Sequence, residues 1–313
     1  MADSSSSPPA DARRTTQVVQ ANSATRALNI LGDRWTLMIL YLAFQRVRRF
    51  EDFQGRIGVA RSLLTDRLRR LTAAGVLEKV RYQERPVREE YRLTERGRDL
   101  YSLALMIIAW EKRWFFDPTH PAHQVRHTCG KPFTPQYRCG CCGEVVTARD
   151  VYVIDGPGAG VEPSQPPRAQ RRSIVPAEGL NAGNPMLDRA FQVLGDRWTS
   201  HVIASAFMGR RRFGDLQAAL GIAPNILSDR LGVLRKILYQ DKPQRWEYRL
   251  TDQGRDLYPL IAELNRWGDR WLDGGEGPPL ITYHRPCGPL KAKITCDQCG
   301  EPAGLDSVAA LDA

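Results

Sequence analysis

The most constraining feature of this chain is that part of its sequence occurs twice. Leu31-Gly-Asp-Arg-Trp-Thr36 recurs as Leu194-Gly-Asp-Arg-Trp-Thr199, and Leu64-Thr-Asp-Arg-Leu68 recurs as Leu227-Ser-Asp-Arg-Leu231, each 163 residues later. Self-similarity of this length indicates two copies of one domain, and 313 residues suit two domains. Because the unit is far longer than a solenoid repeat, we expect each copy to have its own core and the copies to form a dimer within one chain.

Changes in composition and the Gly- and Pro-rich stretches divide the chain into six segments. They are a Ser- and Pro-rich disordered tail (1–20), the first copy (21–118), a first Cys-rich module (119–154), a Gly- and Pro-rich flexible linker (155–184), the second copy (185–275) and a second Cys-rich module (276–313). The tail lacks the apolar segment of a secretory signal, and the sequence contains no run of 18 apolar residues. We therefore expect no membrane partner.

The elements of the first copy follow from capping residues and periodicity. The expected helices are 27–31, 34–44 with Asp33 as N-cap, one from Arg49 to Gly58, 61–74 followed by Gly75, and a last one from Thr94 to Trp114. Strands are expected at 76–82 and 89–93, joined by a turn around Pro86. This order predicts a mainly α fold with small β-hairpins (α+β), in which each copy is a winged helix-turn-helix domain.

An ordered series of motifs supports this assignment in both copies. In the first copy the motifs are Gly32-Asp-Arg-Trp-Thr36, Arg49-Phe50 with Phe53, Leu64-x-x-Arg67-Leu68-x-x-Leu71, Gly75-Val-Leu77, and Pro86-x-x-x-Glu90-Tyr91-x-Leu93-Thr94-x-x-Gly97. The hairpin motif returns as Pro243-x-x-x-Glu247-Tyr248-x-Leu250-Thr251-x-x-Gly254. Both copies resemble the HxlR family of bacterial transcription regulators, a branch near the MarR group. The resemblance implies DNA binding and dimers joined through the first and last helices.

The helix expected at 61–74 has the two faces of a recognition helix. Leu64, Leu68 and Leu71 share the side that should face the core. The exposed side combines short hydroxyls with arginines, which suit base edges and phosphates, and the net charge of +10 favours a polyanionic partner such as double-stranded DNA. An ordinary solvated helix would look similar. The predicted contacts are Arg61, Ser62, Thr65, Arg69 and Arg70.

The wings and the second copy complete the predicted DNA surface. Wing contacts to phosphate are predicted for Arg85 and Arg88, with Lys242 and Arg245 as their counterparts. The second recognition helix offers Asn225 and Ser228, has no arginine at the positions of Arg69 and Arg70, and is shortened by a gap of six residues before Lys236, with Gly232 expected to fray its end. We therefore expect the two copies to contribute unequally to DNA recognition, with most base contacts from the first copy. The alternative is that drift in the second copy leaves two equivalent half-sites.

Paired tryptophans suggest how the copies associate. Trp110 and Trp114 match Trp267 and Trp271, and each pair lies four residues apart on one helical face. The long linker raises the effective concentration of one copy near the other, which favours an intramolecular pseudo-dimer. Alternatively, the tryptophans cap the core of their own domain. Two such chains could also form a homodimer.

The Cys-rich modules have the spacing of zinc ligands. One Cys3His set is expected within each module, formed by His127, Cys129, Cys139 and Cys142 in the first and by His284, Cys287, Cys296 and Cys299 in the second. His120, His123 or Cys141 could substitute in the first module. Four protein ligands would make the zinc structural. Free buried cysteines without metal and redox sensing remain as alternatives.

These features predict a sequence-specific DNA-binding transcription regulator that acts by occupying an operator. No phosphate loop, nucleophile elbow or recognisable carboxylate pair indicates an enzyme. The alternative function is a ligand-, redox- or metal-responsive sensor in which the second copy serves mainly for assembly. The resemblance together with the absence of an export signal predicts a cytoplasmic, nucleoid-associated bacterial protein.

Overall fold

The structure is a computed structural model that describes residues 23–115, 125–159, 190, 193–194, 197–231, 234–240 and 245–310. The first copy contains α1 (Ser23–Leu31), α2 (Arg34–Phe44), α3 (Phe50–Ile57), α4 (Arg61–Ala73), β1 (Leu77–Gln83), β2 (Arg88–Leu93), α5 (Glu95–Arg98) and α6 (Tyr101–Phe115). The second contains α8 (Arg197–Phe207), α9 (Phe213–Leu220), α10 (Pro224–Arg230), β6 (Leu234–Gln240), β7 (Arg245–Leu250), α11 (Asp252–Arg255) and α12 (Tyr258–Trp271). The predicted α+β class is confirmed.

Local signals determine most helix ends in the first copy. The Asp33 carboxylate accepts hydrogen bonds from the backbone N–H groups of Trp35 and Thr36, both at 3.1 Å, and so caps α2. Gly58 and Gly75 follow α3 and α4 in the left-handed conformation, with φ of 70° and 68°. These ends agree with the sequence prediction.

The expected single helix from Thr94 to Trp114 is wrong, because the structure divides it into α5 and α6. Gly97 lies so close to the strand entry that an added Cβ would meet the Val76 carbonyl oxygen at 2.1 Å. Leu100 N–H then donates to Gly97 O at 3.2 Å, which closes a turn between the two helices. The short helix is thus held against the wing while α6 runs into the centre of the molecule.

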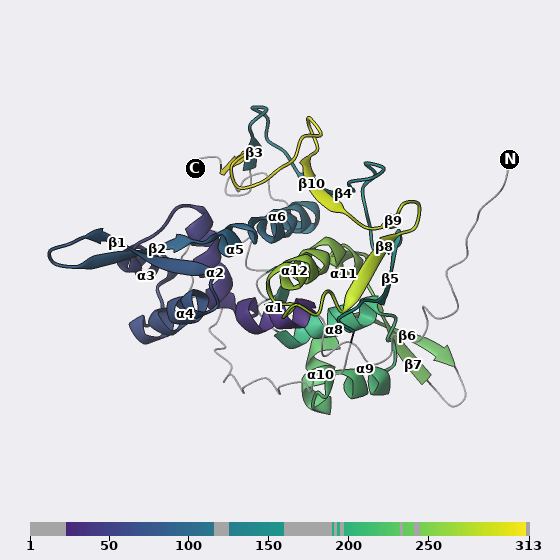
Figure 1. The fold of residues 1–313 in the computed structure, drawn as a ribbon. Helices are drawn as coiled ribbons and strands as arrows, with labels where there is room; N and C mark the ends of the chain where they lie inside the picture. Colours follow the sequence, from purple (N-terminus) through teal and green to yellow (C-terminus); the bar gives the residue numbers. More distant parts are fainter. Residues whose placement is uncertain are drawn as a thin grey trace.

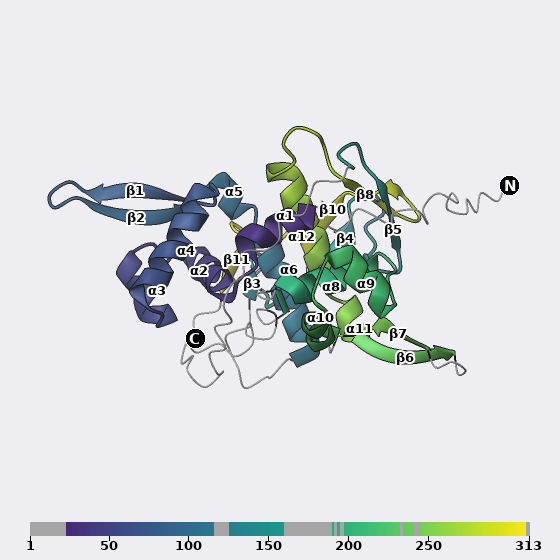
Figure 2. The same ribbon diagram turned by 90° about the horizontal axis from the view of Figure 1, so that it is seen from below.

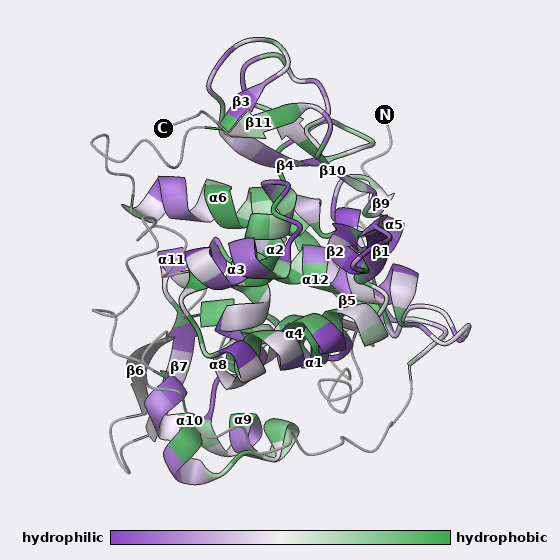
Figure 3. Cartoon of the chain, turned by 90° about the vertical axis from the view of Figure 1, so that its left-hand side faces the viewer, coloured by the Kyte–Doolittle hydropathy of each residue, from purple (hydrophilic) through white to green (hydrophobic). Residues whose placement is uncertain are grey.

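The two halves of the chain, meaning each copy with its Cys-rich module, meet along α6 and α12 (Figure 1). Lobe 1 (α2–α4 with β1 and β2) and lobe 2 (α8–α10 with β6 and β7) lie at opposite ends, and their hairpins point away from each other (Figure 2). Apolar residues gather on the central helices, whereas the β1–β2 hairpin is hydrophilic (Figure 3).

One apolar cluster runs through both halves, so the expectation of a separate core for each copy is wrong. It joins residues such as Leu28, Leu105 and Trp267. Among the described residues, a distinct smaller cluster lies in lobe 2, formed by Val202, Leu216, Leu220, Ile222, Leu227 and Leu231. A helix that packs against the other half cannot complete a core within its own copy.

The tryptophans of α6 and α12 make reciprocal hydrogen bonds across the two halves. Trp110 Nε1 donates to Gln253 O at 3.0 Å, and Trp267 Nε1 donates to Arg96 O at 2.9 Å. Because Arg96 and Gln253 occupy equivalent positions of the repeat, the two bonds are related by an approximate two-fold axis.

Trp114 and Trp271 also make hydrogen bonds that cross to the opposite half. Trp114 Nε1 donates to Asp256 Oδ2 at 3.0 Å, and Trp271 Nε1 donates to Asp99 Oδ2 at 2.8 Å. Asp99 and Asp256 are again equivalent positions. These four indole hydrogen bonds therefore all go to the opposite half.

Helix α1 of the first copy and Ala190 of the second copy also contact the opposite half. Ala24 N–H, in α1, donates to Asn265 Oδ1 of α12 at 2.9 Å, and Ala190 N–H of the second copy donates to Glu111 Oε1 of α6 at 2.6 Å. An added Cβ on Gly268 would meet the Ser23 carbonyl oxygen at 2.3 Å, so the start of α1 packs against α12 at a point where α12 has no room for a side chain.

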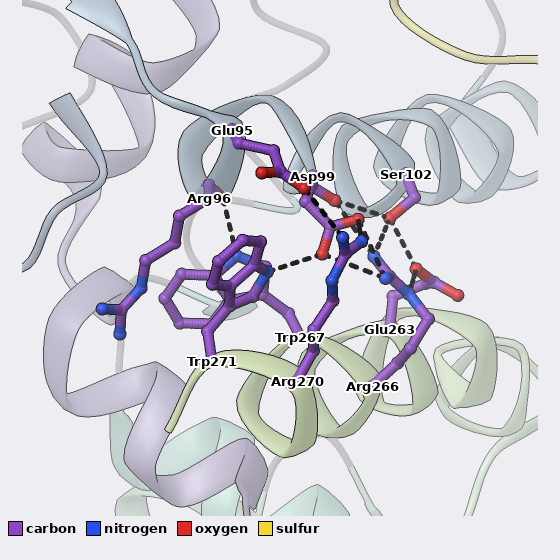
Figure 4. Close-up of polar contacts among 9 residues, drawn as sticks. All are labelled: Glu95, Arg96, Asp99, Ser102, Glu263, Arg266, Trp267, Arg270 and Trp271. Atoms are coloured by element: carbon purple, nitrogen blue, oxygen red, sulfur yellow. Dashed lines mark hydrogen bonds and ion pairs between the residues drawn. The ribbon is translucent and has the colours of Figure 1, made fainter. Parts of the chain in front are cut away.

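Around Asp99 the two-fold relation is broken by an ionic cluster (Figure 4). Arg266 Nη1 lies 3.0 Å from Asp99 Oδ1, and its Nε lies 2.7 Å from Glu263 Oε2. The pKa of Arg266 is raised because these carboxylates outweigh the effect of its burial. The equivalent aspartate, Asp256, pairs at 2.9 Å with Arg113, whose side chain is 68% exposed.

The Cys-rich modules are interleaved. Their strands are β3 (Val125–His127), β4 (Pro135–Cys139), β5 (Val151–Asp155), β8 (Leu280–His284), β9 (Gly288–Pro289), β10 (Ala292–Cys296) and β11 (Val308–Ala310). Strand β4 pairs with β10, β3 with β11 and β5 with β8, all antiparallel, so each pair takes one strand from each half. Tyr137 lies opposite Ile294, its equivalent in the repeat, so the two-fold axis passes through this pair.

Asp99→Ala is expected to destabilise the protein more than the equivalent Asp256→Ala. Loss of Asp99 removes a hydrogen-bonded partner from the half-buried Arg266, at about 2–3 kcal/mol, whereas Asp256 pairs with an exposed arginine and should cost about 1 kcal/mol. Urea unfolding monitored by tryptophan fluorescence measures both. Equal losses would show that the ionic cluster around Asp99 adds nothing to the interface.

Candidate DNA interface and metal centres

Helix α4 presents the two faces that the sequence predicts. Leu64, Leu68 and Leu71 are buried against the rest of lobe 1. The predicted DNA contacts on this helix are all exposed, namely Arg61, Ser62, Thr65, Arg69 and Arg70. The geometry therefore leaves these five side chains available to a ligand.

Two of the three exposed arginines of α4, Arg69 and Arg70, are held by one carboxylate. Asp66 Oδ1 lies 2.7 Å from Arg69 Nη2, and Asp66 Oδ2 lies 2.9 Å from Arg70 Nε. Burial raises the pKa of Asp66, but the arginines outweigh it and keep this pKa below its ordinary value. The carboxylate stays ionised at neutral pH and fixes the directions of two guanidinium groups that would otherwise move freely.

Arg67 has a structural role that sequence reasoning missed. It is 8% exposed, and its guanidinium reaches Asp33 Oδ1 at 3.0 Å and Asp66 Oδ2 at 2.7 Å. Arg67 thereby connects α4 to the N-terminus of α2. The sequence did contain a signal for this role, since the pair Asp-Arg occurs at 33–34 and again at 66–67. Arg67, the arginine of the second pair, is the residue that turns inward.

The first wing carries cations at its tip. Arg85 and Arg88 are exposed where β1 turns into β2. Near the tip end of β1, the Arg49 guanidinium lies 4.9 Å from the centre of the Tyr82 ring. The hairpin extends beyond the helices of lobe 1 in both views of the ribbon (Figures 1 and 2).

The second copy presents a smaller surface. Helix α10 has 7 residues against 13 in α4, so the predicted shortening is confirmed. Asn225 and Ser228 are exposed on it. Gly232 and Lys242 lie outside the described residues, and Arg245 is described only by its backbone pairing with Gln240.

The cysteines and histidines form two clusters, and both combine the two modules. One contains His127, Cys129, Cys296 and Cys299, and the other contains Cys139, Cys142, His284 and Cys287. In each cluster the potential ligand atoms lie within 4.8 Å of one another. The expectation of one set within each module is therefore wrong. Antiparallel pairing of β4 with β10 places the Cys-x-x-Cys turn of one half beside the His and Cys of the other.

The alternative ligands predicted for the first module do not belong to either cluster of described residues. Cys141 is exposed and belongs to neither, and His120 and His123 lie outside the described residues. All seven cysteines are free thiols.

Each Cys-x-x-Cys segment forms a tight turn closed by a glycine. Gly143 N–H donates to Cys139 O, and Gly300 N–H donates to Cys296 O, both at 2.9 Å. These glycines have φ of 78° and 77°, a conformation that other residues rarely adopt. The Gln298 N–H also points at Cys296 Sγ at 3.4 Å. Such turns direct two thiolates at one ion, so the donor set fits zinc.

The histidine of the first cluster is oriented as a metal ligand would be. His127 Nδ1 lies 3.4 Å from Cys299 Sγ, while Nε2 lies 3.2 Å from the Pro302 carbonyl oxygen. In the second cluster His284 Nδ1 lies 3.7 Å from Cys142 Sγ. A carbonyl acceptor at one ring nitrogen favours the tautomer whose other nitrogen is free to coordinate.

Hydrogen bonding spreads the pKa values of the thiols. A backbone hydrogen bond from Lys131 lowers the pKa of Cys129 to about 7. The Cys287 thiol has its pKa raised to about 12, foremost by its hydrogen bond with Cys142. Several thiolates in one small space repel each other unless a cation lies between them.

Among the helices that the structure describes, none combines the length and apolar character needed to cross a membrane.

Comparison with known proteins gives one family for both copies. The model of the HxlR-like helix-turn-helix family matches residues 30–118 and 193–276, together more than half of the chain. The Mycobacterium tuberculosis protein named uncharacterized HTH-type transcriptional regulator Rv3095 is 42% identical over 140 residues, covering 44% of this chain and 89% of the relative. The uncharacterized HTH-type transcriptional regulator YvaP of Bacillus subtilis is 32% identical over 96 residues, covering 28% and 89%.

A solved structure is also similar in sequence. The crystal structure of PA1607, described as a transcription factor candidate, is 36% identical, covers 40% of this chain and 88% of that chain, and has a TM-score of 0.36.

Proposed function

The chain belongs to the HxlR-like helix-turn-helix family of transcriptional regulators, which are not enzymes, and we propose that it binds a specific operator through both of its winged helices. The observation that carries this proposal is the exposed face of α4, where Arg69 and Arg70 are oriented by Asp66 beside the free hydroxyl group of Ser62. Arginines and hydroxyls on a helix of this kind contact base edges and phosphates in a major groove.

The two halves act as a pseudo-dimer within one chain. The reciprocal bonds of Trp110 and Trp267 support this arrangement, since equivalent residues exchange the same contact. Helices α4 and α10 lie on the side of the molecule away from the Cys-rich modules (Figure 1). One duplex could then meet both lobes, with the wings at its outer edges.

The two lobes contribute unequally to recognition. Lobe 1 supplies most base contacts, because α4 is nearly twice as long as α10 and carries the paired arginines. Lobe 2 reads a weaker half-site through Asn225 and Ser228, with phosphate contacts from Lys242 and Arg245. The operator is accordingly an imperfect inverted repeat.

A second function is favoured by the shortness of α10 and by the thiol clusters. Here lobe 2 mainly assists assembly, and the chain senses a ligand, a metal or an oxidant. The Cys129 thiol is exposed, so an oxidant can reach it. The two functions differ in whether lobe 2 contributes to operator binding.

As part of the proposed operator-binding function, each Cys3His cluster holds one structural Zn²⁺. Four protein ligands leave no open position, so the ion would supply folding energy without taking part in chemistry. Elemental analysis of purified protein is expected to find two zinc ions per chain. A folded, metal-free chain would contradict this assignment.

Substitutions in lobe 1 are expected to separate base reading from phosphate binding. Once genomic binding sites have given an operator, Arg69→Ala with Arg70→Ala should weaken operator binding about 10- to 100-fold while affecting unrelated DNA less. Arg85→Ala with Arg88→Ala should weaken binding to all sequences and reduce the slope of log K against log salt by about 2. Fluorescence anisotropy across a salt series measures both effects.

The matched control removes the same charge elsewhere. Lys291 and Lys293 are exposed in the second Cys-rich module, and Lys291→Ala with Lys293→Ala should leave the operator preference unchanged. Lys242→Ala with Arg245→Ala tests lobe 2, and an unchanged affinity would assign it to assembly alone. If neither lobe 1 pair weakened binding more than the control, the DNA-binding proposal would be wrong.

A further inference from the structure

Within the part of the chain that the structure describes, neither Cys-rich module has a complete ligand set of its own. Within the first module, His127 and Cys129 belong to one cluster, while Cys139 and Cys142 belong to the other. The same division separates His284 and Cys287 from the Cys-x-x-Cys turn of the second module. Each metal site that the described His and Cys residues form therefore needs both halves of the chain.

The distances around each histidine suit a tetrahedral ion. Zn–N bonds of about 2.0–2.1 Å and Zn–S bonds of about 2.3 Å place neighbouring N and S ligands about 3.5 Å apart. The Nδ1 to Sγ distances are 3.4 Å from His127 to Cys299 and 3.7 Å from His284 to Cys142. In both cases the histidine and the cysteine come from different halves.

The backbone around the first cluster is also shared. His127 lies opposite Val308 in the β3–β11 pair, and its Nε2 faces the carbonyl oxygen of Pro302 in the same opposite half. Thr134 N–H donates to Asp297 Oδ1, between the two clustered cysteines of that half, at 2.9 Å. The ligands are thus positioned by contacts that themselves cross between the halves.

The modules are attached to the DNA-binding part of the chain. Lys112 Nζ, on α6, donates to Phe133 O at 2.7 Å. Arg98, at the end of α5, lies 2.9 Å from Asp306 in the second module. A fixed junction between the modules therefore limits how lobe 1 and α6 move relative to the second half.

We propose that the two Cys3His sites are metal cross-links, in which each Zn²⁺ joins the His and Cys of one half to the Cys-x-x-Cys turn of the other. The proposal deepens the structural zinc assignment of the proposed function and rests on it. Its consequence is that metal binding and the pairing of the two halves are one equilibrium. Removal of zinc loosens the junction above α6 and α12.

The cross-links are tested by zinc counts in double variants that remove two thiols each. Cys129→Ser with Cys299→Ser removes two ligands of one cluster and should leave one ion per chain. Cys129→Ser with Cys142→Ser removes one ligand from each cluster and should leave none. The protein is dialysed against a chelator strong enough to strip three-ligand sites, and zinc is measured by mass spectrometry.

Two controls accompany these variants. The wild type and Cys141→Ser, whose thiol is outside both clusters, should each retain two ions. The opposite order, with no ion in Cys129→Ser/Cys299→Ser and one ion in Cys129→Ser/Cys142→Ser, would show that each site lies within a module and would overturn the proposal.

A measurement on the unaltered protein applies if a double variant fails to fold. Zinc is removed stepwise from the wild-type protein with increasing amounts of a chelator, and the thiols that become free are alkylated. Mass spectrometry of the intact chains and of their peptides then identifies the alkylated cysteines. Cys129 should become reactive together with Cys296 and Cys299, and Cys139 with Cys142 and Cys287. Joint release of Cys129 with Cys139 and Cys142 would contradict the cross-links. Since no DNA is present, a failure here is distinct from a failure of operator binding, and a wild type without zinc would contradict the metal assignment itself.

Discussion

The indole N–H groups of α6 and α12 need acceptors when they are buried, and the structure supplies those acceptors from the opposite half. Trp110 and Trp267 donate to backbone carbonyl groups in the helix that follows the other copy's wing. Neither helix could complete its hydrogen bonds or its apolar contacts inside one copy. The rest of the architecture follows from this exchange, because α1 and the Cys-rich modules must also cross to the other half.

An approximately symmetric frame carries two lobes that differ from each other. The reciprocal tryptophan bonds and strand pairs hold equivalent positions, while the recognition helices differ in length and charge. The centre is asymmetric too, since Arg266 joins Asp99 to Glu263 whereas the equivalent position in α6 is Ala109. A chain that contains both halves can change one without the other, which a dimer of identical chains cannot do.

Local features were predictable from the sequence. The Asp33 cap, the glycines after α3 and α4, and the leucine face of α4 each depend on neighbouring residues, and all agree with the structure. Features that depend on contacts between residues far apart in the sequence were not predictable in this way. The break before α6 arises where Gly97 meets Val76, and the inward turn of Arg67 depends on Asp33.

The metal clusters show the same limit. Spacing identified all eight clustered His and Cys residues, yet spacing cannot tell which copy supplies each partner. In a duplicated sequence, a ligand and its equivalent have the same local signature. Only the pairing of β4 with β10 decides between them, and this pairing connects residues 153 to 161 positions apart.

The central claim is that one chain provides both halves of the DNA-binding unit. Sedimentation equilibrium of the protein with its operator duplex measures the number of chains per DNA most directly. The account predicts that one chain of 35.3 kDa occupies each duplex, with the same stoichiometry as protein concentration rises. A complex that forms only with two chains per operator would contradict it.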